Sequence, residues 1–356
     1  MKGLVLAGGT GTRLRPITHT SAKQLVPLAN KPILFYGLES LAKAGVKDVA
    51  MIVGDTREEV MTAVGDGSKF GLNVTYIHQE KPLGLAHCVQ MAQRVLGDSD
   101  FIMYLGDNFI RDGVEEFVES FANRSDGTNA QILLAKVPDP QRFGVATLDA
   151  VGDVVSLVEK PTVPESDLAL VGVYLFDSAI HEAVHSISPS ARGELEITDA
   201  IQWLITNGKK VRSHIVDGYW KDLGEPEALL EGNRLVLESI ERNISGDVDD
   251  LSTLDGRVVL EPGASVVRSI IRGPAIIGQN TVIKDSFIGP FTSVAAGCVI
   301  ESSEVEHSII LNGSRITNIH RLEGSIIGKS AVVAKTERRP LATRLVVGDH
   351  SRIDLV

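Results

Sequence analysis

Near the start of the chain, glycines and cationic side chains stand in an order suited to binding phosphate. The segment from Gly8 to Arg13, GGTGTR, directly follows an apolar run that ends at Ala7. Glycines adopt positive φ angles and turn backbone N–H groups toward an anion, with no Cβ in the way. Arg15 and Lys23 add positive charge shortly after the loop. The stretch therefore predicts a buried strand that opens into a loop for nucleotide phosphates.

The spacing excludes two common phosphate-binding motifs. A P-loop requires G-x-x-x-x-G-K-[ST], and no lysine followed by Ser or Thr occupies that place here. A dinucleotide fingerprint requires G-x-G-x-x-G, but Leu14 stands where the third glycine should be. A glycine-rich turn can also be a plain connection between two elements, and it is the nearby cations that favour phosphate binding.

Composition excludes several classes of partner and setting. The net charge of −11 argues against nucleic acid or an anionic membrane, because both attract clustered Lys and Arg. The two cysteines, Cys88 and Cys298, are far apart, so we expect neither a disulfide framework nor a cysteine-rich metal site. No run of 18 or more apolar residues and no cleavable leader is evident. We therefore expect a cytoplasmic protein without a membrane partner.

The elements that must position this loop alternate along the chain up to about residue 225. Strands are expected at Lys2–Ala7, Asp48–Gly54, Val74–His78, Phe101–Leu105, Gln131–Val137, Val145–Leu148, Val154–Glu159, Leu168–Phe176 and Val211–Val216. Helices are expected at Ile33–Ala44, Arg57–Val64, Leu85–Leu96, Val114–Asn123, Ala179–Ser186 and Thr198–Asn207. This α/β alternation predicts a mixed, mostly parallel sheet covered on both faces, with ligands at the carboxyl ends of its strands.

The pattern changes after a helix expected at Glu225–Arg242. Aliphatic residues then recur every 17 residues in three registers, which begin at Leu260, Val266 and Ile271. Three such positions per repeat predict a triangular coil whose short strands each point one side chain inward. An ordinary β-sandwich would not produce three parallel registers. We therefore expect a parallel β-helix of hexapeptide repeats, with about five coils.

The spacing of the first register changes near the end of the repeat. The first register is expected to continue through Val294 to Leu311, and the step from there to Ile327 is one residue short of 17. The tail from Lys335 to Val356 is mixed in composition and could cap the open end of the coil.

Seven further motifs, taken together with the glycine loop, distinguish this sequence from a general α/β protein. They are QEKPLGLA (79–86), LGDN (105–108), FGV (143–145), EKP (159–161), GVY (172–174), RGELEITD (192–199) and GYWKD (218–222). Together with LAGGTGTRLRP and KQLVPLANKP, the chain resembles the sugar-1-phosphate nucleotidylyltransferases over nearly its whole length. RGELEITD points to the branch that transfers thymidylyl groups, and the chain as a whole resembles the long form of that branch, which carries a β-helical tail. The resemblance implies a Rossmann-like nucleotidyltransferase domain at residues 1–242 and a left-handed β-helix domain at residues 243–356.

The chemistry of this family explains the residue types. A sugar 1-phosphate attacks the α-phosphorus of a nucleoside triphosphate in line, and two polyanions must be brought together. The resemblance implies that dTTP and glucose 1-phosphate give dTDP-glucose and pyrophosphate. It also implies Mg²⁺, with Asp107 and Asp222 as its ligands, because this hard ion prefers carboxylate oxygen. Considered alone, either aspartate could instead cap a helix or close a turn.

The resemblance also assigns roles to individual residues. Arg13 would stabilise the β,γ-phosphates, Lys23 would lie near the α-phosphate, and Lys160 would hold the sugar phosphate, which makes these three the catalytic residues. The nucleotide site would comprise Leu6, Ala7, Gly8, Gly9, Gly11, Thr12, Arg13, Gln24, Gln79, Pro82, Gly84, Leu85 and Asp107. Within it, Gln79, Pro82, Gly84 and Leu85 would form the loop that reads the pyrimidine base. The sugar-phosphate site would comprise Asn108, Gly144, Glu159, Lys160, Val171 and Tyr174, with Glu194 or Glu196 beside them.

Alternatives remain open from the sequence. A relative that uses UTP or another nucleotide, or a non-catalytic nucleotide-sugar sensor, could keep this fold. The cations Arg13, Lys23 and Lys160 favour an enzyme, because binding alone would not need all of them together with two aspartates. His307 and His320 could serve acyl transfer on the β-helix, but a structural or oligomerising role is expected, and with it a homo-oligomer.

Overall fold

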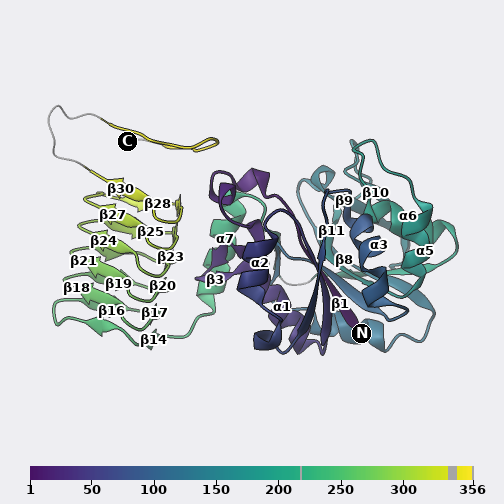
Figure 1. The fold of residues 1–356 in the computed structure, drawn as a ribbon, viewed down its shortest axis with the longest axis horizontal. Coiled ribbons are helices and arrows are strands. Elements are labelled where there is room, and N and C mark those ends of the chain that lie inside the picture. The colour runs from purple at the N-terminus through teal and green to yellow at the C-terminus, as the bar shows by residue number, and fades with distance from the viewer. Residues whose placement is uncertain (217–218, 336–342, 355–356) are drawn as a thin grey trace. The chain divides into compact units, whose positions relative to one another are not determined.

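The computed structural model describes residues 1–216, 219–335 and 343–354, and the chain forms two compact units (Figure 1). The first unit comprises Met1–Gly11, Ser21–Leu25 and Ile33–Asp222. The second unit comprises Thr12–Thr20, Val26–Pro32 and Leu223–Val356. The division into folding domains at residues 242 and 243 stays a prediction.

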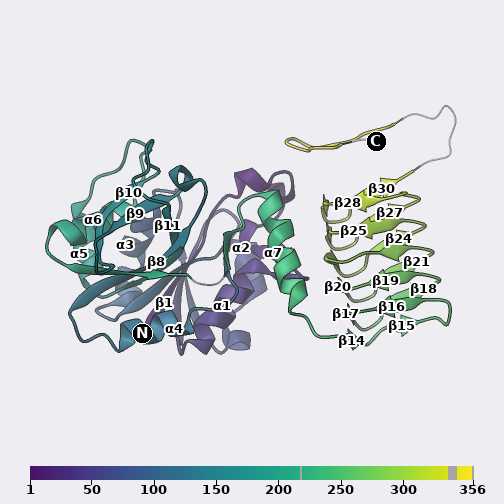
Figure 2. The ribbon, with the colours of Figure 1, turned by 180° about the vertical axis from the view of Figure 1, so that it is seen from behind.

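A mixed sheet forms the centre of the first unit (Figure 2). Over the described residues it has nine strands, and seven of them run in the order β10-β9-β11-β6-β1-β4-β5, with β8 paired to β11 and β12. Their bounds are β1 Lys2–Ala7, β4 Asp48–Val53, β5 Asn73–His78, β6 Phe101–Leu105, β8 Thr128–Lys136, β9 Gly144–Leu148, β10 Val154–Glu159, β11 Leu168–Phe176 and β12 Lys210–Ile215. Strands β6, β1, β4 and β5 are parallel, whereas β11 runs antiparallel to β6, β8 and β9. The mixed α/β fold predicted from the sequence is confirmed.

Helices cover both faces of this sheet because its strands are apolar on both sides. Along β1, Leu4 and Leu6 pack into one hydrophobic cluster, and Val5 and Ala7 pack into another. Alternate side chains of a strand point to opposite faces, so β1 contributes to two cores. The first cluster includes residues of α3 (Leu85–Leu96), α5 (Ala179–Ser186) and α6 (Ile197–Thr206). The second includes residues of α1 (Ile33–Lys43), α2 (Arg57–Val64) and α4 (Glu115–Ala122).

The central parallel strands end together, which creates the edge where a ligand is expected. The backbone N–H of Gly106, just after β6, donates to the carbonyl oxygen of Leu6 in β1 at 2.9 Å. A Cβ on Gly8, just after β1, would lie 3.2 Å from the backbone nitrogen of Gly54, just after β4. Three loops therefore leave the sheet side by side, as the alternating pattern predicted.

The second unit contains the predicted parallel β-helix. Within the described residues it is built from two six-stranded sheets and one five-stranded sheet, all of parallel strands (Figure 1). The first sheet comprises β14 Asn243–Ile244, β17 Val258–Leu260, β20 Ala275–Ile277, β23 Thr292–Val294, β26 Ile309–Ile310 and β29 Ile326–Ile327. The second comprises β15 Asp247–Val248, β18 Ser265–Val267, β21 Val282–Lys284, β24 Val299–Glu301, β27 Arg315–Thr317 and β30 Val332–Ala334. The third comprises β16 Thr253–Asp255, β19 Ile270–Arg272, β22 Phe287–Ile288, β25 Glu304–Glu306 and β28 Leu322–Glu323.

The three aliphatic registers form the interior of this coil, with one correction. Leu260 pairs with Ile277 and Ile277 with Val294, as predicted. The predicted next step to Leu311 is wrong, because Val294 pairs with Ile310, and Ile310 then pairs with Ile327. The short step therefore precedes residue 310. Three aliphatic residues, Ile309, Ile310 and Leu311, are consecutive here, so the sequence alone did not show which one continues the register.

Helix α7 (Pro226–Glu238) packs on one face of the β-helix within the second unit. Leu237 of the helix shares a hydrophobic cluster with Ile276 of β20 and with Ala29. The buried side chain of Asn233 accepts a hydrogen bond from the Ala29 backbone N–H at 2.8 Å and donates to the Phe291 carbonyl oxygen at 3.2 Å. Ala29 lies in the hairpin of β2 (Pro27–Leu28) and β3 (Lys31–Pro32). The helix thus joins this hairpin to the coil.

Candidate active site

The glycine loop after β1 is closely packed by its neighbours in the first unit. A Cβ on Gly9 would lie 3.2 Å from Nε2 of Gln24, and Gly11 has a φ of 64°. Gln24 itself is 2% exposed, and its Oε1 has no hydrogen-bond partner among the described residues. A buried acceptor without a donor is costly, and a bound ligand could supply the donor.

Lys23 lies between two carboxylates that come from distant parts of the chain. Its ammonium group donates a hydrogen bond to Oδ2 of Asp107 and lies 3.7 Å from Oδ1 of Asp222. Asp107 follows β6, and Asp222 ends β13 (Trp220–Asp222). The side chain of Lys23 is 8% exposed, so this cluster of charges is largely shielded from water. The structure brings together the predicted catalytic lysine and both predicted metal ligands.

The charges in this cluster stabilise one another. Burial raises the pKa of Asp107, but the positive charge of Lys23 and hydrogen bonds from Lys23 and Asn108 outweigh that effect and hold it below the ordinary value. Asp107 is therefore ionised at neutral pH. Two carboxylates that converge on one cation have the donor chemistry that Mg²⁺ requires, since this ion usually takes one or two protein carboxylates and completes its shell with water and phosphate.

A short antiparallel pair of strands positions the two aspartates. Strand β13 pairs with β7 (Asn108–Ile110), and Asp222 lies opposite Asn108. The indole N–H of Trp220 donates to Oδ1 of Asn108 at 2.6 Å, and Nδ2 of Asn108 donates to Oδ1 of Asp107 at 3.1 Å. Asn108 is 3% exposed, so its amide is engaged within the protein. Its predicted contact with the sugar phosphate stays a prediction.

A second charged cluster surrounds the end of β10. Glu159 lies 3.7 Å from the ammonium of Lys160 and 3.5 Å from the guanidinium of Arg192. Arg192 also holds Glu196, with a closest distance of 2.8 Å, and Glu196 is 4% exposed. Burial raises the pKa of Glu159, and the two neighbouring cations only partly offset that rise. Thr198 completes the cluster by donating to Oε2 of Glu159 at 3.4 Å.

Backbone geometry supports a binding role for this region. Lys160 has a φ of 42°, which is unusual for a residue with a side chain, and its N–H is held by the Phe143 carbonyl oxygen at 2.9 Å. A Cβ on Gly144 would lie 3.2 Å from Oε2 of Glu159. The predicted residues Gly144, Glu159 and Lys160 therefore lie together.

The remaining predicted sugar contacts are buried in the sheet. Val171 is fully buried in one hydrophobic cluster, and Tyr174, 3% exposed, lies in the other. Burial, and after it the charge of Glu159, raise the pKa of Tyr174 far above its ordinary value, so the phenol stays protonated. Because the side chains of Val171 and Tyr174 point to opposite faces, a sugar could meet only one of them through its side chain. Both assignments stay predictions.

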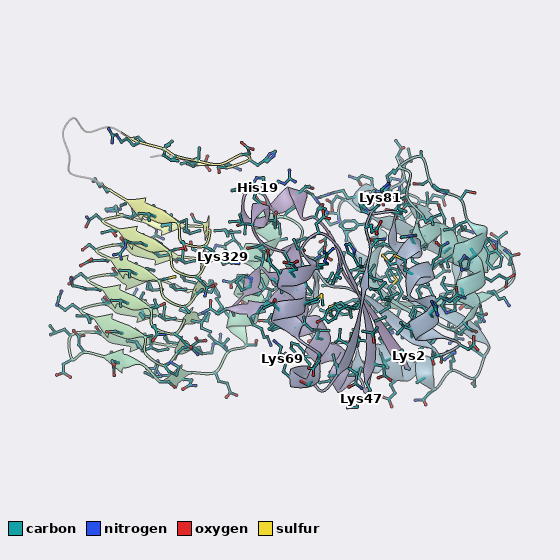
Figure 3. All side chains as sticks on the ribbon, in the orientation of Figure 1. Lys2, His19, Lys47, Lys69, Lys81 and Lys329 are labelled. Atoms are coloured by element: carbon teal, nitrogen blue, oxygen red, sulfur yellow. The ribbon has the colours of Figure 1, made fainter. Side chains whose placement is uncertain are left out.

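The predicted base-reading loop joins β5 to α3 and is anchored by the segment before α6. Leu195 donates its N–H to the Leu83 carbonyl oxygen at 2.8 Å and accepts from the Ala86 N–H at 3.0 Å. Gly84, with a φ of 103°, lies so close that a Cβ would be 2.3 Å from the Leu195 oxygen. Pro82 in this loop is exposed, as is Lys81, which is labelled in Figure 3. The loop of Gln79, Pro82, Gly84 and Leu85 is thus fixed at its base and open at its tip.

Two predicted phosphate ligands belong to the second unit. Thr12 and Arg13 open the short 3₁₀ helix Thr12–Leu14. The guanidinium of Arg13 is 57% exposed and lies 3.5 Å from a carboxylate oxygen of Glu225, just before α7. Gly218, part of the GYWKD motif, lies outside the described residues.

Several site residues were not singled out from the sequence. Trp220 and His87 were not assigned, although both stand inside or beside quoted motifs. Arg192 and Thr198 lie in RGELEITD, a motif that indicates the family but does not show which side chains these residues contact. Their partners are distant in sequence, so spacing alone gave no signal for them.

Two further observations bear on ligands. Over residues 1–216, 219–335 and 343–354, no group of three or more His, Cys, Asp or Glu is arranged to hold a metal ion. The predicted pair Asp107 and Asp222 is smaller than such a group, and its metal role stays a prediction. None of the helices in the described part of the chain is long and apolar enough to cross a membrane.

The chain belongs to the nucleotidyl transferase family, whose sequence model matches residues 2–239. It is 58% identical to the glucose-1-phosphate thymidylyltransferase of Streptomyces griseus over 100% of this chain and 99% of that protein. The protein of the same name from Streptomyces antibioticus is also 58% identical, with the same coverage. The predicted family and the prediction of a nucleotidyltransferase enzyme are confirmed.

A solved structure supports the fold of the catalytic part. A Bacillus anthracis protein in complex with sucrose matches with a TM-score of 0.63 and 35% identity. The match covers 68% of this chain and 97% of that one.

Proposed function

We propose that this enzyme transfers a thymidylyl group from dTTP to α-D-glucose 1-phosphate and releases dTDP-glucose and pyrophosphate. The observation that carries the proposal is its full-length similarity, at 58% identity, to two proteins named for that activity. The cluster of Lys23, Asp107 and Asp222 supports it, because the lysine supplies one cation and the two carboxylates would hold the Mg²⁺ that a reaction between two polyanions needs.

The reaction requires positioning and charge stabilisation, with no covalent intermediate on the enzyme. An oxygen of the sugar phosphate attacks the α-phosphorus of dTTP, and the bond to the β-phosphate oxygen breaks on the opposite side. Lys23 is largely buried, so its charge acts on the phosphates at reduced solvent screening. Holding two reactants in line can supply several orders of magnitude in rate.

The triphosphate would be held by the glycine loop and by Arg13. The backbone N–H groups at Gly8, Gly9 and Gly11 would face its oxygens, and the planar guanidinium of Arg13 would bind the departing pyrophosphate. Arg13 is 57% exposed, so its side chain is accessible to a ligand. Gln24, with its buried Oε1, would complete the nucleotide site.

Asp107 and Asp222 would hold Mg²⁺, which neutralises phosphate charge when bound. Both carboxylates already face one cation, the ammonium of Lys23. The metal would therefore enter a site that is pre-organised for positive charge.

The sugar phosphate would lie at the second charged cluster. Glu159 would accept hydrogen bonds from sugar hydroxyls, and the ammonium of Lys160 would hold the phosphate. Arg192 fixes Glu196 and approaches Glu159, so it orients the acceptors of this cluster. A cytoplasmic location and assembly into a homo-oligomer are further predictions of this proposal.

The proposal is tested by supplying glucose 1-phosphate with dTTP, UTP, ATP or dCTP and following pyrophosphate release. We expect the highest kcat/KM with dTTP in the presence of Mg²⁺, and loss of turnover when EDTA removes the metal. Equal or greater turnover with UTP would reject the thymidylyl assignment. Nucleotide-sugar binding without any turnover would indicate a sensor.

A further inference from the structure

A histidine outside the predicted site contacts the side chain that is predicted to read the base. Nδ1 of His87, in the first turn of α3, lies 2.9 Å from Nε2 of Gln79, which follows β5. His87 is not among the residues assigned above to nucleotide, sugar or metal. Any effect of His87 on a bound nucleotide would therefore be transmitted through Gln79.

The chemistry of this hydrogen bond determines which end of the amide faces the helix. An amide nitrogen only donates, so Nδ1 of His87 must accept, which requires a neutral ring with its proton on Nε2. Burial lowers the pKa of His87 and so favours that neutral ring. A protonated ring would present an N–H to Gln79 and would require the amide to turn over.

Cys88, the next residue on α3, is buried, and burial raises the pKa of its thiol to about 12. The thiol itself donates to the Gly84 carbonyl oxygen at 3.5 Å. With its nitrogen end toward His87, the Gln79 amide leaves its oxygen end for a ligand.

We propose that His87 is a positioning residue that fixes the Gln79 amide with its oxygen toward the nucleobase, and so selects a base with an N–H at ring position 3. Thymine and uracil donate from N3 and would satisfy that oxygen. Cytosine has an unprotonated N3, which would face the amide oxygen as a second acceptor. The inference rests on the proposed function and on the predicted contact between Gln79 and the base.

The test compares kcat/KM for dTTP, UTP and dCTP in the full-length enzyme and in His87→Ala. We expect KM for dTTP to rise about tenfold, the value of one lost hydrogen bond, with kcat at saturation little changed. The ratio of kcat/KM for dTTP over dCTP should fall about tenfold, because the freed amide can turn its N–H to cytosine. The dTTP over UTP ratio should stay constant, since both bases carry N3–H.

Three further variants separate positioning from general damage. His87→Asn should restore most of the dTTP over dCTP ratio, because an asparagine oxygen can accept from Gln79 near the position of Nδ1. His87→Phe removes the acceptor but keeps the ring volume, and it should behave as His87→Ala does. The matched control is His185→Ala, which breaks a histidine contact to another glutamine, Gln93, also at 2.9 Å, and should leave both ratios unchanged.

The outcomes distinguish the two proposals. An unchanged dTTP over dCTP ratio in both His87→Ala and His87→Phe would overturn the role of His87. An equal fall with all three nucleotides would also overturn it, since that result indicates structural damage. Wild-type enzyme that turns over no dTTP would instead reject the proposed function.

Discussion

The indole N–H of Trp220 donates to the side-chain oxygen of Asn108 at 2.6 Å, although the two residues are 112 positions apart. Asn108 passes this constraint on by donating from its amide nitrogen to Asp107. The Asp107 carboxylate, which is proposed to bind Mg²⁺, is therefore oriented by Asn108, and Asn108 is itself held by Trp220. Such outer partners commonly matter for metal affinity almost as much as the ligands do.

Trp220→Phe tests this relationship, because phenylalanine keeps an aromatic ring against Phe143 but lacks the N–H. We expect the Mg²⁺ concentration for half-maximal activity to rise about tenfold, since Asn108 is no longer fixed. The measurement is activity against Mg²⁺ concentration. Trp203→Phe, on α6, replaces the other tryptophan and should leave that concentration unchanged. Equal curves for the two variants would show that the indole N–H has no role.

Asp107→Asn tests the metal assignment directly. The variant removes one of the two negative charges that face Lys23, and we expect kcat to fall by at least about 100-fold while the circular dichroism spectrum is retained. Asp112→Asn is the matched control. It makes the same substitution at a nearby position in the sequence, where the side chain is 62% exposed. Near-normal turnover in Asp107→Asn would remove this residue from the catalytic site.

The pH dependence of sugar-phosphate binding should follow the protonation of Glu159. Its pKa is raised by burial, so protonation begins at a higher pH than for an ordinary glutamate, and the ionised acceptor is lost as pH falls. We expect KM for glucose 1-phosphate to increase from pH 8 toward pH 5 more steeply in the wild type than in Glu159→Gln. The substrate phosphate also titrates, near a pKa of about 6, but it does so equally with both enzymes. Parallel pH profiles would contradict the role of Glu159.

The same shift predicts a pH-dependent stability. A carboxyl group with a raised pKa in the folded state binds its proton more tightly there than in the unfolded chain. Its contribution to stability is therefore present below the ordinary pKa of 4.5 and is lost as pH rises through the folded value. Glu159→Gln should unfold at a higher urea concentration than the wild type at pH 8. The difference should shrink at low pH, and a difference that grows there would contradict the sign.

Gly84→Ala should disturb both the nucleotide loop and the fold. The new methyl group would meet the Leu195 carbonyl oxygen at 2.3 Å, and Gly84 has a φ of 103°. We expect a loss of about 2 kcal/mol or more in the free energy of unfolding, together with a higher KM for dTTP. Gly71→Ala is the control, since Gly71 has a φ of 74° but no atom within 4 Å, and it should cost about 1 kcal/mol with no change in KM. Equal effects of the two substitutions would exclude a role for the Leu195 contact.

Much of the fold could be predicted from the sequence because it follows from periodicity. Strand Phe101–Leu105 and helix Leu85–Leu96 agree to the residue with the expected bounds. Short elements carry no period, so the three-residue strands that place Trp220 and Asn108 side by side were not predicted. Within the β-helix, neighbouring aliphatic residues left the register ambiguous near residue 310.

The candidate site shows the same division. Asp107 and Asp222 were proposed from family motifs, and both face Lys23 in the structure. The contacts of Arg192 with Glu196 and of His87 with Gln79 depend on rotamers and on how loops pack, which a single sequence does not contain. Sequence motifs therefore identified the charged groups, whereas the residues that orient them required the structure.

The β-helix is stabilised by a column of serines that links successive coils. Ser269 Oγ accepts from the Ser286 N–H at 3.0 Å, Ser286 Oγ accepts from the Ser303 N–H at 3.2 Å, and Ser303 Oγ accepts from the Ile319 N–H at 3.1 Å. Ser286 also donates to the Lys284 carbonyl oxygen at 2.6 Å, so its hydroxyl satisfies groups of two coils. These positions recur because each coil exposes one backbone N–H at the same corner.

Ser286→Ala should therefore destabilise the coil more than loss of one surface hydroxyl would. The substitution leaves the Ser303 N–H without its acceptor in a buried position, and we expect a loss of about 1–3 kcal/mol in the free energy of unfolding. Ser325→Ala is the matched control, because the Ser325 hydroxyl donates to the Glu323 carbonyl oxygen at an exposed corner, at 2.9 Å. Urea unfolding followed by circular dichroism measures both variants. If the two lose the same stability, the column contributes no more than its individual surface hydrogen bonds.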